Sequence, residues 1–166
     1  MDEWIFGLLD YWIMEYTKRR NLNRGYMKLE VWQRGMDLFE MAYRLASAVP
    51  DFKLRSQFTD AAQSVSANIA EGYGRRTLPE YLQFVYTAKG SLAEALTRTC
   101  GLWGVGLVSA DDFEKFDQLH YEVENKLLSL ISSLESKRGT GEWQDALPRS
   151  NNPTTQRSTN HERPAD

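Results

Sequence analysis

The chain has 166 residues, 42% of them hydrophobic and 26% charged, which suits one soluble domain with a single buried core. Its formal net charge of −3 provides no overall positive field to attract nucleic acid or an anionic membrane. One cysteine and two histidines exclude an intramolecular disulfide and an ordinary structural zinc site. No run reaches the roughly 18 uninterrupted apolar residues of a membrane span, and the start of the chain is acidic rather than basic. We therefore expect a cytoplasmic protein with no membrane partner.

The chain divides into a leader (residues 1–26), a helical domain (27–136) and a polar tail (137–166). The tail has too few apolar residues to offset the entropy of ordering it, so it is predicted to be disordered. The leader is predicted to be an extra N-terminal helical segment, ended by Lys18, Arg19 and Arg20. It either packs on the domain as a fifth helix or lies on a partner or membrane surface. Alternatively, Met27 is the true start. The apolar stripe of the leader consists of Trp4, Ile5, Leu8, Leu9, Trp12, Ile13 and Tyr16.

The first two helices of the domain are predicted over about residues 29–48 and 54–72. Pro50 ends the first, and Gly72 and Gly74 end the second, because glycine tolerates the conformations that helix ends need. In both helices apolar residues recur every three or four positions, the spacing of one buried face. The stripes are Val31, Gly35, Leu38, Ala42, Leu45 and Val49, then Leu54, Phe58, Ala61, Ala62, Val65 and Ile69.

The third and fourth helices have the clearest starting signals. Thr77 and Glu80 fit a capping box with Pro79 in the first turn, and Ser109 is a capping serine followed by acidic residues. Glycines after Thr99 end the third helix. The core stripes are Leu82, Val85, Ala88, Leu92, Leu96, Thr99 and Trp103, then Phe113, Phe116, Leu119, Val123, Leu127, Leu130, Ile131 and Leu134.

Four helices with short connections and no strand-like alternation predict an all-α fold, an antiparallel up-down-up-down four-helix bundle. Cys100 lies among apolar residues and is expected to be a small core residue rather than a reactive thiol. His120 is expected to be a surface or hydrogen-bonded histidine. No phosphate-binding loop, nucleophile motif or metal-ligand spacing is present. The sequence therefore predicts no enzyme, no cofactor and no small-molecule substrate.

The densest polar cluster falls at the end of the second helix. Asn68 and Glu71 are predicted to form a buried polar clasp that bonds to the following loop or the third helix and fixes register. Arg75 and Arg76 come after the helix end and are candidate anion or nucleic-acid contacts. On the third helix, Lys89 and Arg98 are further candidates of the same kind.

Small residues also interrupt the third helix, at Gly90 and Ser91. They are expected to allow a neighbouring helix to approach closely. An aromatic surplus, beyond what four inner stripes need, is expected to lie partly at subunit interfaces. These residues are Trp32, Tyr43, Tyr81, Tyr86 and Trp103.

Five segments, in order over about residues 28–134, resemble the bacterial four-helix bundle family named for open reading frames in 23S rRNA intervening sequences. The resemblance implies a four-helix fold without enzymatic activity, commonly assembled as a homopentamer. The five segments are Leu29 to Gln33, Gln57 to Ser64, Asn68 to Gly72 with Arg75, Glu80 to Phe84, and Ala88 to Glu94.

A related branch of this family contains accessory proteins of diversity-generating retroelements, which bind a reverse transcriptase and nucleic acid through a basic surface. This chain departs from that branch. Residues 27–136 hold 11 Lys+Arg against 15 Asp+Glu, and Thr59 and Asp60 replace an arginine pair of the family. A homo-oligomeric interaction protein is therefore the first hypothesis, and RNA or reverse-transcriptase binding is the alternative.

Overall fold

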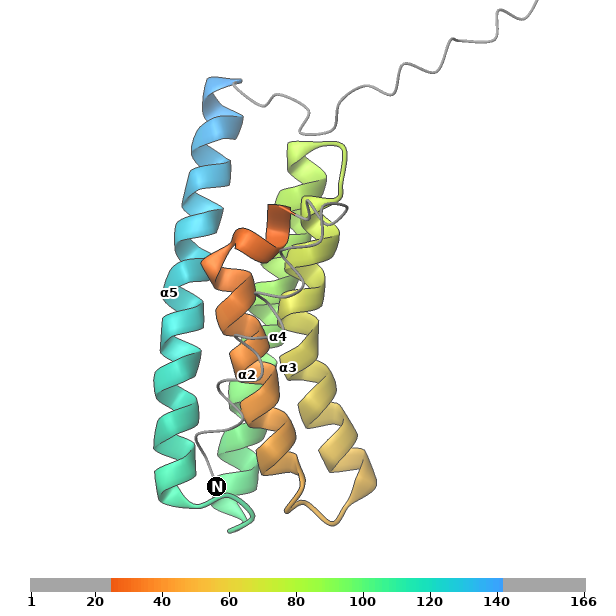
Figure 1. Ribbon diagram of the computed structural model, residues 1–166, viewed down its shortest axis with the longest axis vertical. Coiled ribbons are helices and arrows are strands. Elements are labelled where there is room, and N and C mark those ends of the chain that lie inside the picture. The colour runs from red at the N-terminus through yellow and green to blue at the C-terminus, as the bar shows by residue number, and fades with distance from the viewer. Residues whose placement is uncertain (1–24, 142–166) are drawn as a thin grey trace, which may run out of the picture.

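The computed structural model describes residues 25–141, and the rest of the predicted leader and tail lies outside the described residues. No strand occurs within this range, which confirms the all-α prediction. A short 3-10 helix, η1, precedes four α-helices (Figure 1). The elements are η1 (Gly25–Lys28), α2 (Glu30–Ala46), α3 (Phe52–Tyr73), α4 (Leu78–Gly104) and α5 (Ala110–Thr140).

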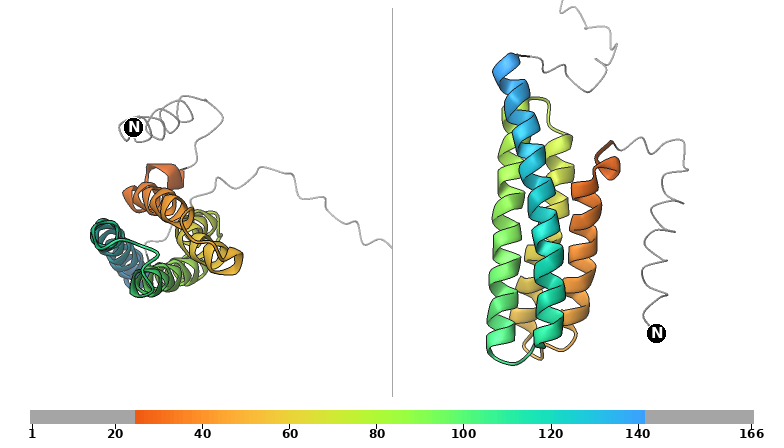
Figure 2. Two further views of the ribbon diagram at one scale, coloured as in Figure 1. Left: turned by 90° about the horizontal axis from the view of Figure 1, so that it is seen from below. Right: turned by 90° about the vertical axis from the view of Figure 1, so that its left-hand side faces the viewer.

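Each helix packs against its neighbours in sequence, and α2 closes the bundle by packing against α5 (Figures 1 and 2). The connections between helices are short, so consecutive helices run in opposite directions. This is the predicted up-down-up-down arrangement. Helix α5 has 31 residues and α2 only 17, so α5 extends well past the start of α2.

The helix starts follow the capping signals of the sequence. Thr77 and Glu80 form the predicted capping box, with Pro79 in the first turn of α4. The Ser109 side chain accepts a hydrogen bond from the backbone N–H of Asp112 at 3.1 Å and so caps α5. Both predictions are confirmed.

The predicted domain boundaries shift at both ends. Gly25 and Tyr26, assigned to the leader, belong to η1, and the Tyr26 ring lies 5.5 Å from that of Trp32. Residues 137–140, assigned to the tail, are the last turn of α5, which Gly141 ends in a left-handed conformation (φ 69°). Lys137 and Arg138 favour this extension because cations stabilise the negative end of the helix dipole.

Most of the predicted inner stripes form the core, from Leu38 on α2 to Leu134 on α5. Three core predictions are wrong, those for Cys100, Leu54 and Trp103, which are all exposed. Cys100 is exposed, because the neighbouring Thr99 faces inward and its hydroxyl donates to the carbonyl oxygen of Ala95 at 2.9 Å. Leu54 is also exposed, one turn before the core residue Phe58.

Of the two alternatives expected for His120, the structure excludes the surface position. His120 is buried, and its Nε2 lies 3.2 Å from the carbonyl oxygen of Leu92, so a hydrogen bond joins α5 to α4. The expectation of a hydrogen-bonded histidine holds. Among residues 25–141, no helix combines the length and the hydropathy needed to cross a bilayer.

Candidate functional site

Glu71, Arg75 and Arg98, polar residues singled out in the sequence, lie along the seam between α3 and α4. The two helices approach closely at Gly72, where a Cβ atom would lie 2.8 Å from the Cβ of Phe84. The same atom would lie 3.2 Å from the carbonyl oxygen of Tyr81. This close approach leaves no room for long polar side chains inside the seam, so they lie at its outer edge.

Asn68 and Glu71 do not form the predicted buried clasp. The Asn68 amide is half-buried and donates to the carbonyl oxygen of Ser64, on its own helix, at 2.7 Å. Glu71 is exposed and pairs with Arg75. The prediction is wrong about burial because Val65 and Ile69 take the core-facing positions of this part of α3 and leave Asn68 on the flank.

Arg75 is held against the start of α4. Its Nη2 donates to a carboxylate oxygen of Glu71, and its guanidinium carbon lies 4.4 Å from the ring centroid of Phe84, a cation–π contact. Its Nε is buried and has no hydrogen-bond partner among the described residues. An exposed ion pair such as Glu71–Arg75 contributes only about 0.2–1 kcal/mol and would by itself hold the Arg75 side chain weakly. The cation–π contact with Phe84 therefore adds materially to the positioning of Arg75.

Arg98 joins the two helices further along the seam. Its Nη1 donates to the side-chain oxygen of Gln57 on α3 at 3.0 Å. Its Nε and Nη2 donate to one carboxylate oxygen of Glu94 at 2.9 and 2.6 Å. Arg98 is therefore a cross-helix link whose charge is already compensated.

Arg76 and Lys89 differ from the two partnered arginines. Both are exposed, and neither makes a hydrogen bond or ion pair within residues 25–141. The four cations also do not converge on one point. Arg75 lies at the level of Phe84, and Arg98 comes 14 positions later on α4. At 1.5 Å per residue this separates them by about 21 Å along the helix.

The outer face of α4 consists of exposed small residues at helical spacing. A Cβ atom added at Gly90 or Gly101 would meet nothing within 4 Å. Ala93 and Thr97 lie between these glycines and are exposed as well, and Tyr86 stands one turn before Gly90 with 45% of its surface exposed. We call these five residues the α4 outer face. Gly90 faces outward, so no helix of the same bundle uses the close approach that was expected there.

Of the five aromatic residues counted as surplus, Trp32 and Tyr81 belong to the core. Burial, with a smaller contribution from Tyr73, raises the pKa of the Tyr81 hydroxyl to about 12. The other three, Tyr43, Tyr86 and Trp103, are exposed.

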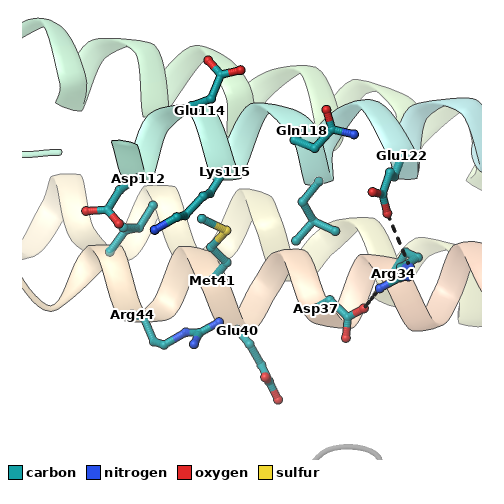
Figure 3. Close-up of a pocket in the computed structure, with 12 residues that line it drawn as sticks. Arg34, Asp37, Glu40, Met41, Arg44, Asp112, Glu114, Lys115, Gln118 and Glu122 are labelled. Carbon is teal, nitrogen blue, oxygen red and sulfur yellow. Dashed lines mark hydrogen bonds and ion pairs between the residues drawn. The ribbon is translucent and has the colours of Figure 1, made fainter. Parts of the chain in front are cut away.

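A groove runs between α2 and α5 (Figure 3). Its lining includes the apolar side chains of Met41, Leu45 and Leu119. Arg34 lies at one end, 3.0 Å from a carboxylate oxygen of Asp37 and 3.7 Å from one of Glu122. The groove therefore carries internally paired charges beside a short apolar strip.

The chemistry of the groove lining is limited. Burial is the main cause that raises the pKa of the Glu40 carboxyl, and the nearby Asp37 raises it further. No histidine, cysteine, serine or threonine is among the lining residues. In the part of the chain that the structure describes, no three His, Cys, Asp or Glu residues come together as metal ligands would.

The fold and these surfaces define a small antiparallel four-helix bundle with a flat face of small side chains on α4. The model of the 23S rRNA-intervening sequence protein family matches residues 27–129, so the chain belongs to that family. A crystal structure of a protein of unknown function from the S23 ribosomal protein family of Bacteroides thetaiotaomicron is similar, with a TM-score of 0.58 and 16% identity. The alignment covers 61% of this chain and 97% of that one, and supports the fold alone. No curated protein matches.

Proposed function

We propose that the protein is a non-enzymatic, cytoplasmic bundle that acts by associating with copies of itself through the α4 outer face. The observation that supports this proposal is the open space outside Gly90 and Gly101. Glycine in an exposed helix interior costs about 1 kcal/mol relative to alanine, and no contact within the described bundle requires it at these positions. Small side chains allow a helix of another subunit to come close.

The charge and shape of this face also support association. Glu94, the nearest acidic residue on α4, is paired with Arg98, so the face presents little uncompensated negative charge. Tyr86 adds an exposed aromatic ring, a residue type enriched in interfaces. Its hydroxyl donates to Glu135 on α5 at 2.5 Å, which holds the ring in place. The resemblance to the family favours a closed homopentamer.

Sedimentation velocity of the full chain at micromolar concentrations tests this proposal. The wild type is expected to form one closed oligomer, and Gly90→Arg is expected to dissociate it without unfolding the bundle, since the new side chain enters open space. Ser132→Arg, at an exposed small residue of α5, is the matched control and should leave the oligomer intact. A wild type that is monomeric throughout, or equal effects of both variants, would contradict the proposal.

A second candidate function is RNA binding, alone or together with a reverse transcriptase. It is supported by the separation of charge. Arg76, after the end of α3, and Lys89, on α4, are exposed and make no hydrogen bond or ion pair within residues 25–141, and acidic residues gather on the first half of α5. A locally positive surface can therefore exist despite the acidic total. The acidic residues are Asp111, Asp112, Glu114, Asp117, Glu122 and Glu124.

This alternative is tested by sedimenting the full chain with structured ribosomal RNA at low and high salt. Phosphate contacts lose affinity steeply as salt rises. Binding at low salt that disappears in Arg76→Glu/Lys89→Glu would support the RNA function. Arg75 is the weaker target, because reversing its charge also breaks the contact with Phe84. Absent or salt-independent binding would leave self-association as the function.

A further inference from the structure

An apolar stripe runs along α2, on the flank that faces α3, and packs against the core everywhere except at its last residue. Arg34, Met41 and Leu45 line the groove toward α5, so the opposite flank of α2 turns toward α3. On that flank Trp32, Met36, Phe39 and Tyr43 recur at intervals of four, three and four residues. Trp32 is buried, Met36 and Phe39 are half-buried, and Tyr43 is 67% exposed, with its ring 6.2 Å from that of Phe39. The stripe becomes steadily more exposed toward the end of α2.

At the start of α2, a ring contact links Trp32, the first residue of the stripe, to Tyr26, which follows the first described residue, Gly25. The Tyr26 ring lies 5.5 Å from that of Trp32 and 6.3 Å from that of Tyr73, at the end of α3. Gly25 is pressed against Tyr73, since a Cβ atom at Gly25 would lie 2.0 Å from the Tyr73 hydroxyl. The described chain therefore begins, at Gly25, beside the first residue of the stripe.

The sequence of residues 1–24 matches the stripe in length and character. Seven of its apolar residues recur at helical spacing from Trp4 to Tyr16. As a helix, these 13 residues would span about 18 Å, and the 11 steps from Trp32 to Tyr43 span about 17 Å. The leader is covalently attached, so its effective concentration at the stripe is high.

We propose that residues 4–16 dock as a helix on the α2 stripe of the same chain, antiparallel to α2. Equal rise per residue then places Tyr16 near Trp32, Leu9 near Phe39 and Ile5 near Tyr43. The docked helix removes the exposed ring of Tyr43 from water, together with the apolar face of the leader. The site uses a different helix from the α4 outer face, so the proposal does not depend on self-association.

Hydrogen–deuterium exchange of the full chain, read by mass spectrometry, tests the proposal. Amides within residues 4–16 are expected to exchange at least about tenfold more slowly than an unstructured segment. Tyr43→Asp should remove this protection, because it places a charge in the docking surface. Tyr121→Asp, at a tyrosine that is 60% exposed on α5, is the matched control and should keep it. Both substitutions lie at exposed rings, so the bundle amides should be unchanged in each.

Three outcomes would overturn the proposal. Residues 4–16 could exchange at unstructured rates in the wild type, which would mean that no docked helix forms. They could keep their protection in Tyr43→Asp, which would place the leader elsewhere. Their protection could fall on dilution, which would mean that the leader docks on another copy of the chain.

Discussion

Gly35 on α2 and Ser66 on α3 face each other across the contact between these two helices. A Cβ atom at Gly35 would lie 2.8 Å from the Ser66 hydroxyl oxygen. That hydroxyl is buried and has no hydrogen-bond partner among the described residues. Gly35 has no side chain, and this leaves room for the side chain of Ser66. The Ser66 hydroxyl makes no hydrogen bond in this contact.

The Gly35–Ser66 contact predicts a non-additive pair of substitutions. Gly35→Ala should lower the free energy of unfolding by about 1–3 kcal/mol, the usual cost of overpacking. Ser66→Ala should be neutral or stabilising by about 1 kcal/mol, because it removes a buried unsatisfied hydroxyl. The double variant should recover part of the loss, since the atom that clashes is gone. Urea denaturation of all four proteins measures this coupling, and strictly additive effects would contradict it.

Two glycines near the C-terminal ends of α3 and α4 should respond in opposite ways to alanine. Gly72→Ala should destabilise the bundle by about 1–3 kcal/mol, since its Cβ would press on Phe84 and on the backbone of Tyr81. In the Gly90→Arg background, where the proposed self-association is lost, Gly101→Ala should stabilise it by about 0.5–1 kcal/mol, because the new methyl group meets nothing within the bundle and alanine is the better helix former. Urea denaturation at one protein concentration compares them. A loss of stability in Gly101→Ala would show that this position is occupied by something outside the chain.

The sequence predicted the elements that local signals specify. The capping box at Thr77, the capping serine at Ser109 and the regular stripes gave the four helices and their order. The sequence-based prediction failed where the rotation of a helix about its axis decides which of two neighbouring residues is buried. Cys100 and Thr99 differ by one position, and only packing against the other helices selects which one is buried.

The candidate site could be predicted only in part for the same reason. Sequence identified Arg75 and Arg98 as cations, but their partners, Phe84 and Gln57, lie on the neighbouring helix and are set by the tertiary register. The outward direction of Gly90 has no local signal either. A glycine within a helical pattern suits both a close helix contact and an exposed face, and three-dimensional packing distinguishes them.

The capping box predicts a stability change in acid. The hydrogen bond from the Thr77 side chain is the main cause that lowers the pKa of the Glu80 carboxyl below its ordinary 4.5. A carboxyl with a lowered pKa in the folded state stabilises the protein above its unfolded pKa, and this contribution is lost as pH falls through the folded pKa. Glu80→Gln should therefore lose less stability than the wild type below about pH 4.5. Asp117→Asn, at an exposed carboxyl of α5 without a hydrogen bond or ion pair to the described residues, is the control. Identical acid profiles for the wild type and Glu80→Gln would contradict the prediction.

Glu40 should show the opposite pH dependence. Its carboxyl has a pKa raised above 4.5, first by burial and then by Asp37, so ionisation at neutral pH disfavours the folded state. The destabilisation by ionised Glu40 decreases as pH falls through the raised pKa. It is absent below about pH 4.5, where the carboxyl is protonated in both the folded and the unfolded protein. Glu40→Gln should therefore raise the free energy of unfolding at pH 7, by a modest amount because solvent still screens the side chain, and the difference should vanish in acid. Urea denaturation between pH 4 and pH 7 measures it, with Glu114→Gln, at an exposed residue of the same groove, as the matched control. A Glu40→Gln variant that is less stable than the wild type at pH 7 would show that the carboxylate makes a favourable contact in the groove that outweighs its burial.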